Sequence, residues 1–362
     1  MTWNIKQTAC TVALLAMIGC DAQVELREGD GGPPATPQSE VNGVLLNSFR
    51  LNSFRLNSFR LNSFRLNGDP GSGDYIELMD IDLPGKAKAE HSSVQGSTLY
   101  VKTTGGKLLG REQLEGTVFS FTVQENDVTI HRDVRITDVR QLDENDADED
   151  HDCEGWGHGK KKNKKNKKKN KNVDAWDDDG SDVALYDLEI REGGKGKWKP
   201  LCVDEQGQAT KAVLLTDIWD PETGDRVSPR PTDAVTFACV DAALGKCVLW
   251  GYRPWAKVNG EPLADYHQAC TRLARADYCG NGVSYTVTGT PIHVLDELGI
   301  EVKGLDISYA VEAEWGPDGA ICLNAENTRL PDQEVVCELP SCGADFSSGG
   351  LIQTGKVLGL LP

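Results

Sequence analysis

Eight of the 11 cysteines lie between Cys202 and Cys342, where apolar and polar residues alternate most clearly. An even number of cysteines at this density favours a disulfide framework, provided that the chain is exported to an oxidising compartment. Each bridge contributes about 2–4 kcal/mol to the stability of a small domain. We therefore expect four disulfides among Cys202, Cys239, Cys247, Cys270, Cys279, Cys322, Cys337 and Cys342.

The pairing of these cysteines stays open, because eight cysteines allow roughly a hundred connectivities. One pair can be argued against. Leu263, Tyr266, Cys270 and Leu273 have helical spacing. If this helix reached Cys279, the two cysteines would lie about 13 Å apart along it, whereas a disulfide tolerates about 7 Å. We expect each of the two to bond elsewhere.

The N-terminus predicts export. Lys6 precedes an apolar stretch over residues 8–19, which is shorter than the roughly 20 residues of a membrane span and typical of a signal peptide. The stretch ends in Ala16-Met17-Ile18-Gly19-Cys20. This end resembles the lipobox of bacterial lipoproteins, which implies that residues 1–19 are removed and that Cys20 carries a lipid anchor. Cleavage after Ala22, giving a secreted protein, is the alternative.

Residues 20–74 predict a disordered tether. Residues 21–42 are polar and include two adjacent glycines and two adjacent prolines, and residues 46–65 are four identical copies of Leu-Asn-Ser-Phe-Arg. The period resembles that of pentapeptide repeats, but the small residue expected two positions before the centre is missing. Stacked repeats also need at least about three units to bury a core. We interpret the copies as a linker, with self-association and a packed repeat as alternatives.

A charged insert is predicted over residues 143–181. It begins with eight acidic residues from Asp143 to Glu154 and continues with nine lysines. The net charge is −18, and without these lysines 29 basic and 56 acidic side chains leave −27. Blocks of like charge repel and stay solvated. Because predicted strands lie on both sides, the segment is typical of a long insertion in a hairpin.

Three other interpretations of the insert concern ligands. The aspartates alternate from Asp146, but His151 and Gly157 stand where a calcium-binding EF loop needs Gly and Glu. His151, Cys153 and His158 are too few donors to predict zinc. We expect no metal and no cofactor. An anionic polymer is a possible partner, without specific nucleic-acid recognition, for Lys160, Lys161, Lys162, Lys164, Lys165, Lys167, Lys168, Lys169 and Lys171.

The remaining sequence predicts an α+β fold that is mostly β, a compact disulfide-stapled domain with short helices. We expect helices over residues 241–246 and 263–276. Period-two patterns bounded by Gly and Pro predict strands over residues 75–81, 98–102, 117–123, 128–139, 183–190, 212–218, 234–239, 283–287, 292–295, 307–314 and 321–323. We divide this region into a β-rich N-terminal part (75–142), a cysteine-rich domain (182–345) and a C-terminal tail (346–362).

Several segments of the cysteine-rich part carry a family resemblance. They are Trp250-Gly-Tyr-Arg-Pro-Trp255, His267-Gln-Ala-Cys-Thr-Arg272 and Arg275-Ala-Asp-Tyr-Cys-Gly-Asn-Gly282, with flanks at 198–202 and 315–322. Together they resemble the ADYC domain, over roughly residues 75–342. The resemblance implies an uncharacterised exported protein or lipoprotein of myxobacteria, and it implies no particular activity.

The motif suggests two roles for its residues. Cys279 is a candidate nucleophile with His267 or His293 as base and Asp277 to orient it, since nucleophilic catalysis needs a thiolate beside a base. The even cysteine count favours a structural role instead, with Arg272 and Arg275 paired to Asp277. Likewise, the aromatic side chains at 250–255 either line a sugar-binding surface or pack in the core, and we favour the core.

We therefore expect a lipid-anchored protein of the bacterial cell envelope, attached to the membrane surface and displaying a non-enzymatic binding or structural domain. The alternatives are an exported thiol enzyme that uses Cys279 and His267, and a polyanion-binding adhesin that uses the lysine run. Protein partners are not predicted.

Overall fold

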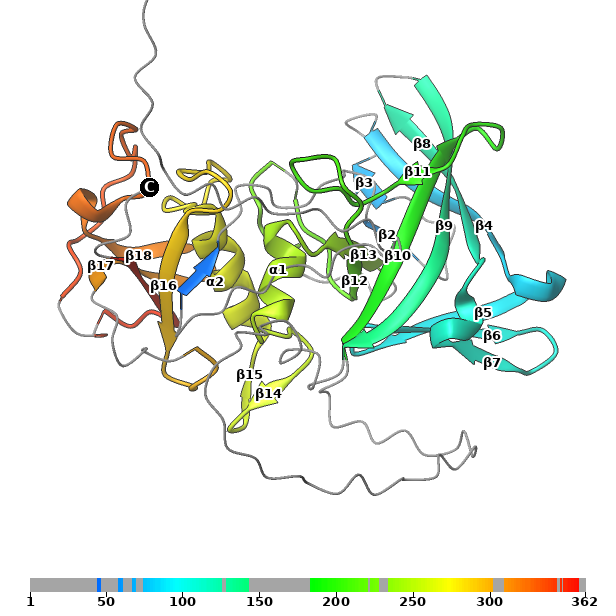
Figure 1. Ribbon diagram of the computed structural model, residues 1–362, viewed down its shortest axis with the longest axis horizontal. Coiled ribbons are helices and arrows are strands. Elements are labelled where there is room, and N and C mark those ends of the chain that lie inside the picture. The colour runs from blue at the N-terminus through cyan, green and yellow to red at the C-terminus, as the bar shows by residue number, and fades with distance from the viewer. Residues whose placement is uncertain are drawn as a thin grey trace, which may run out of the picture. The chain divides into compact units, whose positions relative to one another are not determined.

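The computed structural model describes residues 44–46, 58–60, 67–69, 74–125, 128–142, 183–220, 222–227, 234–301, 309–343, 346 and 348–357. Within these ranges the fold is mostly β with two α-helices, which confirms the expected class (Figure 1). Cys20, the lysine run and the ligand candidates of the insert lie outside these ranges. No helix in the described ranges has the length and apolarity that crossing a membrane requires.

The larger sheet has nine antiparallel strands. It draws on both the N-terminal part and the cysteine-rich domain, so these two ranges share one sheet. The strand β2 at one edge also contacts β4, near the other edge. The order is β2 (Ser58–Arg60), β13 (Ala234–Cys239), β12 (Ala212–Leu215), β10 (Val183–Glu192), β9 (Val128–Leu142), β8 (Val118–Glu125), β4 (Asp74–Asp82) and β3 (Asn67–Asp69), with β11 (Lys199–Pro200) on β10.

The charged insert joins the two longest strands of this sheet. β9 and β10 pair from Leu142 opposite Val183 to Arg132 opposite Glu192, with a bulge between Asp187 and Leu188. The strands that flank the insert are therefore direct neighbours. This confirms the prediction of a long hairpin insertion.

One face of the larger sheet builds an aromatic core. Phe237 on β13 lies 6.2 Å from Phe119 on β8 and 5.6 Å from Tyr186 on β10, between ring centres. Leu99 and Val101 of the small sheet, both fully buried, join this core. The small sheet consists of β5 (Ala89–Gln95), β6 (Thr98–Thr103) and β7 (Leu108–Gly110), with 3-10 turns at Pro84–Lys86 and Arg111–Leu114.

A second sheet and both helices form a separate core. The strand order is β1 (Val44–Leu46), β16 (Pro291–Asp296), β19 (Ile352–Val357), β17 (Tyr309–Gly316) and β18 (Gly319–Leu323). Helix α2 (Ala264–Arg275) contacts β17, β18 and β19, and it packs against helix α1 (Ala243–Leu249). The two-stranded β14 (Lys257–Val258) and β15 (Glu261–Pro262) and a 3-10 turn at Ala325–Asn327 complete the fold.

Three sequence predictions need correction. Part of the predicted C-terminal tail is the central strand β19, whose Ile352 and Thr354 are buried between β16 and β17. Three short pieces of the predicted tether, β1 to β3, pair with strands of the body. The predicted strand 283–287 is irregular, because the Ser284 hydroxyl and the Tyr285 amide both donate to the Arg275 carbonyl oxygen at the end of α2.

All eight cysteines of the body are paired. The bonds are Cys202–Cys239, Cys247–Cys270, Cys279–Cys337 and Cys322–Cys342. Cys270 and Cys279 bond elsewhere, as expected, although the helix ends at Arg275 rather than reaching Cys279. The second bond joins α1 to α2, and the third spans 58 residues, the largest separation of the four.

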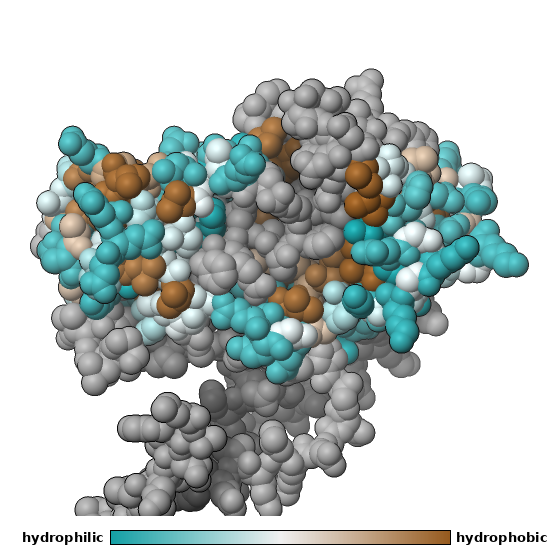
Figure 2. All heavy atoms as spheres, turned by 90° about the horizontal axis from the view of Figure 1, so that it is seen from above, coloured by the Kyte–Doolittle hydropathy of each residue, from teal (hydrophilic) through white to brown (hydrophobic). Residues whose placement is uncertain are grey.

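The surface shown in Figure 2 is mostly hydrophilic among the described residues, and its apolar side chains lie in separate groups. The most exposed large apolar side chains, Val336 at 74% and Val128 and Val287 at 57%, come from three different segments of the chain. Scattered apolar side chains are normal for a surface. These three side chains alone do not indicate an apolar docking site.

Removing the Tyr186 hydroxyl tests how the small sheet is held. This hydroxyl donates to the Ser97 carbonyl oxygen at 3.0 Å and accepts from the Leu99 amide at 2.8 Å, in a buried position. We expect Tyr186→Phe to lower the free energy of unfolding by about 1–3 kcal/mol, because two backbone groups lose their partner. Denaturant titration measures the change. The control Tyr309→Phe removes a 3.4 Å hydrogen bond from a partly exposed tyrosine and should cost less than about 0.5 kcal/mol; equal losses would contradict the assignment.

Candidate functional site

The candidate site begins where helix α2 ends. Ala276 adopts a left-handed conformation, with φ 51° and ψ 41°, directly after the last helical residue. This turns the chain back, so that the Asp277 amide donates to the Arg272 carbonyl oxygen at 2.9 Å. Left-handed residues commonly end helices in this way. The Ala-Asp-Tyr-Cys segment is therefore the C-cap of α2 and the turn that follows.

The Asp277 carboxylate is the centre of a buried ion cluster. It accepts from the Arg272 guanidinium at 2.6 Å, and the Arg275 guanidinium lies 3.7 Å away. The same carboxylate accepts from the backbone amides of Asn281 at 3.1 Å and Gly282 at 3.0 Å. Asp277 is fully buried. The predicted pairing of the two arginines with Asp277 is confirmed, and the carboxylate also holds the following loop.

Arg272 connects this cluster to two other segments. Its guanidinium donates to the Thr223 carbonyl oxygen at 2.6 Å, to the Pro317 carbonyl oxygen at 3.2 Å and to the Asp225 carboxylate. Only 1% of its side chain is exposed. Each N–H donor of a buried guanidinium needs an acceptor, because an unpaired buried charge costs several kcal/mol. Arg272 thereby fixes the loop 222–225 and the turn after β17 to the end of α2.

Two glycines allow these segments to approach closely. A Cβ on Gly280 would lie 1.7 Å from the Asp318 carbonyl oxygen, and one on Gly282 would lie 1.8 Å from the Glu222 carbonyl oxygen. Both glycines also have positive φ, 62° and 83°, which other residues rarely adopt. The Gly-Asn-Gly that follows the cysteine is therefore required by backbone packing.

Tyr278 forms a second buried polar cluster. Its hydroxyl donates to Glu312 at 2.5 Å, and Glu312 forms a bidentate pair with Arg329 at 2.8 and 3.0 Å. The phenol ring stacks on Trp315 at 5.4 Å. Burial and the negative charge of Glu312 raise the pKa of Tyr278 well above its ordinary value. Tyr278 is thus a neutral hydrogen-bond donor packed in the core.

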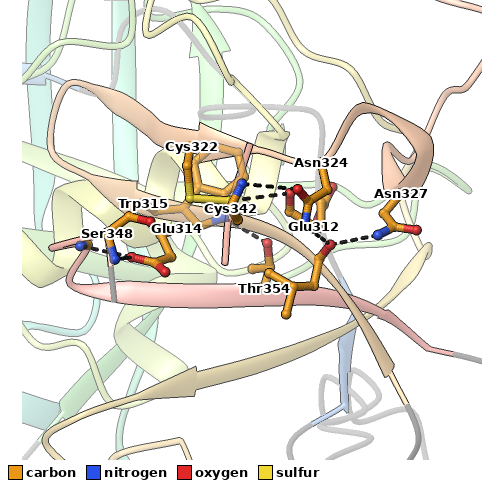
Figure 3. Close-up of a disulfide and its surroundings, with 11 residues drawn as sticks. Glu312, Glu314, Trp315, Cys322, Asn324, Asn327, Cys342, Ser348 and Thr354 are labelled. Carbon is orange, nitrogen blue, oxygen red and sulfur yellow. Dashed lines mark hydrogen bonds between the residues drawn. A yellow bond between two sulfur atoms is a disulfide. The ribbon is translucent and has the colours of Figure 1, made fainter. Parts of the chain in front are cut away.

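A neighbouring disulfide, Cys322–Cys342, lies beside β17 (Figure 3). The Cys342 amide donates to the Asn324 side chain at 3.0 Å, while Asn324 and Asn327 both donate to the Val311 carbonyl oxygen. The buried Glu314 carboxylate accepts from the Ser348 amide at 2.8 Å. These contacts join the segment after β18 to the strand that carries Glu312.

The proposed catalytic residues have separate partners. The Cys279 sulfur is bonded to Cys337, so it is not a free thiol. The His267 Nε2 faces the Leu244 carbonyl oxygen at 3.0 Å, and its ring lies 5.6 Å from that of Trp219. Asp277 is occupied by the arginines and the loop amides. The structure therefore gives these three side chains different neighbours rather than a shared reaction centre.

His267 is held as a neutral imidazole. A carbonyl oxygen only accepts, so Nε2 carries the proton in its contact with Leu244. The side chain is fully buried, and this burial lowers its pKa from 6.5 to about 4. The adjacent bond Cys247–Cys270 ties the same turn of α2 to α1. His267 is thus part of the contact between the two helices.

Sequence reasoning missed the buried charges of β17. Glu312 and Glu314 were expected in a strand but not in the core, and the structure buries both, at 1% and 0% exposure. Apolar–polar alternation assigns glutamates to solvent, and their partners Arg329 and Ser348 are distant in the chain. Trp250 and Tyr252 are buried, which confirms core packing for these two, whereas Trp255 and Arg253 of the same segment are half-buried. No cluster of three or more His, Cys, Asp or Glu suited to a metal occurs among the described residues.

Comparison with known proteins identifies a family. The family model of the ADYC domain matches residues 112–329, which include the helix end, the Ala-Asp-Tyr-Cys segment and Arg329. This confirms the resemblance, over a shorter range than the residues 75–342 expected. No curated protein and no solved structure gives a significant match.

Breaking the central ion cluster should destabilise the domain. We expect Asp277→Asn to lower the free energy of unfolding by about 3–5 kcal/mol, because the buried Arg272 loses its one buried charged partner and keeps only the exposed Asp225. The matched control is Asp265→Asn, since Asp265 pairs with Arg226 at 2.7 Å but is 63% exposed. That change should cost at most about 1 kcal/mol. Denaturant titration of both variants tests the difference, and similar losses would refute the central role of Asp277.

His267 should make stability depend on pH. Its pKa is about 4 in the folded chain and about 6.5 when unfolded, so the unfolded state binds the proton first as the pH falls. The stability is therefore complete above about pH 6.5, and about 3 kcal/mol of it is lost by pH 4. His267→Gln should reduce this loss relative to wild type, as measured by denaturant titration between pH 7 and 4. The exposed His91→Gln is the control and should leave the loss unchanged.

Proposed function

This chain belongs to the ADYC domain family, and we propose that it is a lipid-anchored protein of the bacterial cell envelope with a binding or structural role rather than a catalytic one. The observation that carries the proposal is the disulfide Cys279–Cys337, which uses the one cysteine of the family motif. A thiol enzyme would need this sulfur as a free thiol, whereas here it forms the bond that closes a loop of the fold.

The other motif residues support the same role. Asp277 binds Arg272 and the loop amides, and Tyr278 binds Glu312 and stacks on Trp315. Each side chain thus satisfies a buried partner that would otherwise be unpaired. A reacting group would have to leave these contacts, at the energetic cost of a buried unpaired charge. The motif is better suited to holding a surface domain together than to chemistry.

The compartment is supported by the cysteines. Four disulfides are consistent with an extracellular location, since such bonds persist in oxidising compartments. The lipobox-like end at Cys20 and the polar segment after it add the anchor and the tether to the proposal. A lipid chain contributes about 0.8 kcal/mol per buried CH₂, so several chains hold a protein on a membrane.

The two alternatives make different predictions. A thiol enzyme needs Cys279 reduced beside His267, whereas His267 contacts Leu244 and Trp219. A polyanion-binding adhesin would use the lysine run from Lys160 to Lys171, and its retention on heparin would fall steeply with salt. The first is disfavoured by these contacts, and the second is compatible with an anchored surface domain.

Intact mass, with alkylation before and after reduction, tests the proposal. We expect the native chain to begin at an acylated Cys20 and its eight body cysteines to react with iodoacetamide only after reduction. Cys20→Ala should release the protein from the membrane fraction, while Ser39→Ala, within the same polar segment, should not. Alkylation of Cys279 without reduction would overturn the structural assignment, and unchanged membrane association of Cys20→Ala would overturn the anchor.

A further inference from the structure

One unit of the Leu-Asn-Ser-Phe-Arg repeat is an edge strand of the larger sheet. The strand β2, Ser58–Arg60, belongs to the third of the four copies. It pairs antiparallel with β13, with Ser58 opposite Thr236, Phe59 opposite Val235 and Arg60 opposite Ala234 (Figure 1). The repeat therefore supplies backbone hydrogen bonds to the folded body.

The strand that receives this unit is firmly held. β13 pairs on its other side with β12 from Thr236 to Cys239. Its Val235 and Phe237 side chains are 2% and 1% exposed, and Cys239 is bonded to Cys202. The side of β13 that faces away from β12 presents a row of N–H and C=O groups, which pair with β2 here and can pair with another extended segment of the same sequence. The edge of β13 is thus a preformed acceptor for an extended peptide.

The four copies are equivalent donors for this acceptor. They have identical sequences, so each can offer the same Ser-Phe-Arg backbone to β13. One chain carries four donor units for one acceptor edge. The donor units therefore outnumber the acceptor edge of their own chain, and exchange of an identical element between two copies costs little free energy.

Charge adds a second reason for the repeat to bind the folded body. Each copy contains one arginine and no acidic residue, while the whole chain has a net charge of −18. Opposite charges raise the rate at which two surfaces meet. The arginine of each unit is therefore attracted to an acidic body, that of its own chain or that of another copy.

We propose that the edge of β13 is a receptor for a Ser-Phe-Arg unit from a second copy of this chain, so that the protein self-associates by strand exchange. This inference is independent of the lipid anchor and of the proposed non-enzymatic role. It assigns the repeat a partner, namely the same protein.

The test uses a variant, here named the acceptor chain, whose repeat cannot form a strand and so cannot pair with β13 of another chain. In it, the Ser and Phe of all four copies are replaced by proline, which lacks the amide hydrogen and is excluded from paired strands. A matched variant with Thr and Tyr at these positions keeps the ability to form a strand. All full-length chains carry Cys20→Ala, and retention of the four disulfides shows that the acceptor chain is folded.

Differently tagged chains are then mixed and purified through one tag. We expect the tagged acceptor chain to co-purify with the chain that has intact repeats, and equally with the Thr/Tyr chain. The amount of either partner should be at least about tenfold larger than the amount of a second, differently tagged acceptor chain. Exchange of the backbone amide hydrogens at Ala234–Thr236 should be faster in the acceptor chain alone than in the chain with intact repeats. It should slow again when the two chains are mixed. Absence of recovery, or equal recovery between two acceptor chains, would overturn the proposal.

Discussion

The buried contact between Arg272 and Asp277 is the interaction on which the cysteine-rich fold depends. It lies where α2 ends, and each partner holds further backbone: Arg272 binds the carbonyl oxygens of Thr223 and Pro317, and Asp277 binds the amides of the loop to Gly282. Burying two charges costs free energy, and their attraction compensates only if the remaining donors and acceptors are filled. Here they are filled by loops, so the ion pair determines where those loops lie.

The disulfides act on the same parts of the chain. Apolar residues make up 39% of the sequence, and several core positions are charged, including Glu312 and Glu314. A core of this kind relies on cross-links and on complete hydrogen bonding more than on apolar area. Cys279–Cys337 closes the loop that contains the Asn281 and Gly282 amides bound by Asp277, and Cys322–Cys342 closes the loop that contains Arg329, the partner of Glu312. The family motif is therefore best explained as the point where a cap, an ion cluster and a cross-link coincide.

If the motif is structural, interactions with other molecules must come from other parts of the chain. The repeat is one such part, because one of its units pairs with β13. The charged insert is another, because it leaves the sheet between two adjacent long strands. Both are supported by the same rigid sheet. This arrangement suits a surface protein in which the folded domain presents segments of biased composition.

The fold class, the hairpin insertion and the presence of four disulfides could be predicted from the sequence. The bounds of β12, β13, β16 and the two helices were also predicted, to within a few residues. These follow from local periodicity and from an even cysteine count. Only the tertiary structure decided which cysteines pair, that β19 is central, that the segment 283–287 is not a strand and that Glu312 is buried. Each of these depends on a partner far away in the chain, such as Arg329 for Glu312. Local pattern does not encode such distant partners, since the free energy of a buried charge is set by what the fold brings beside it.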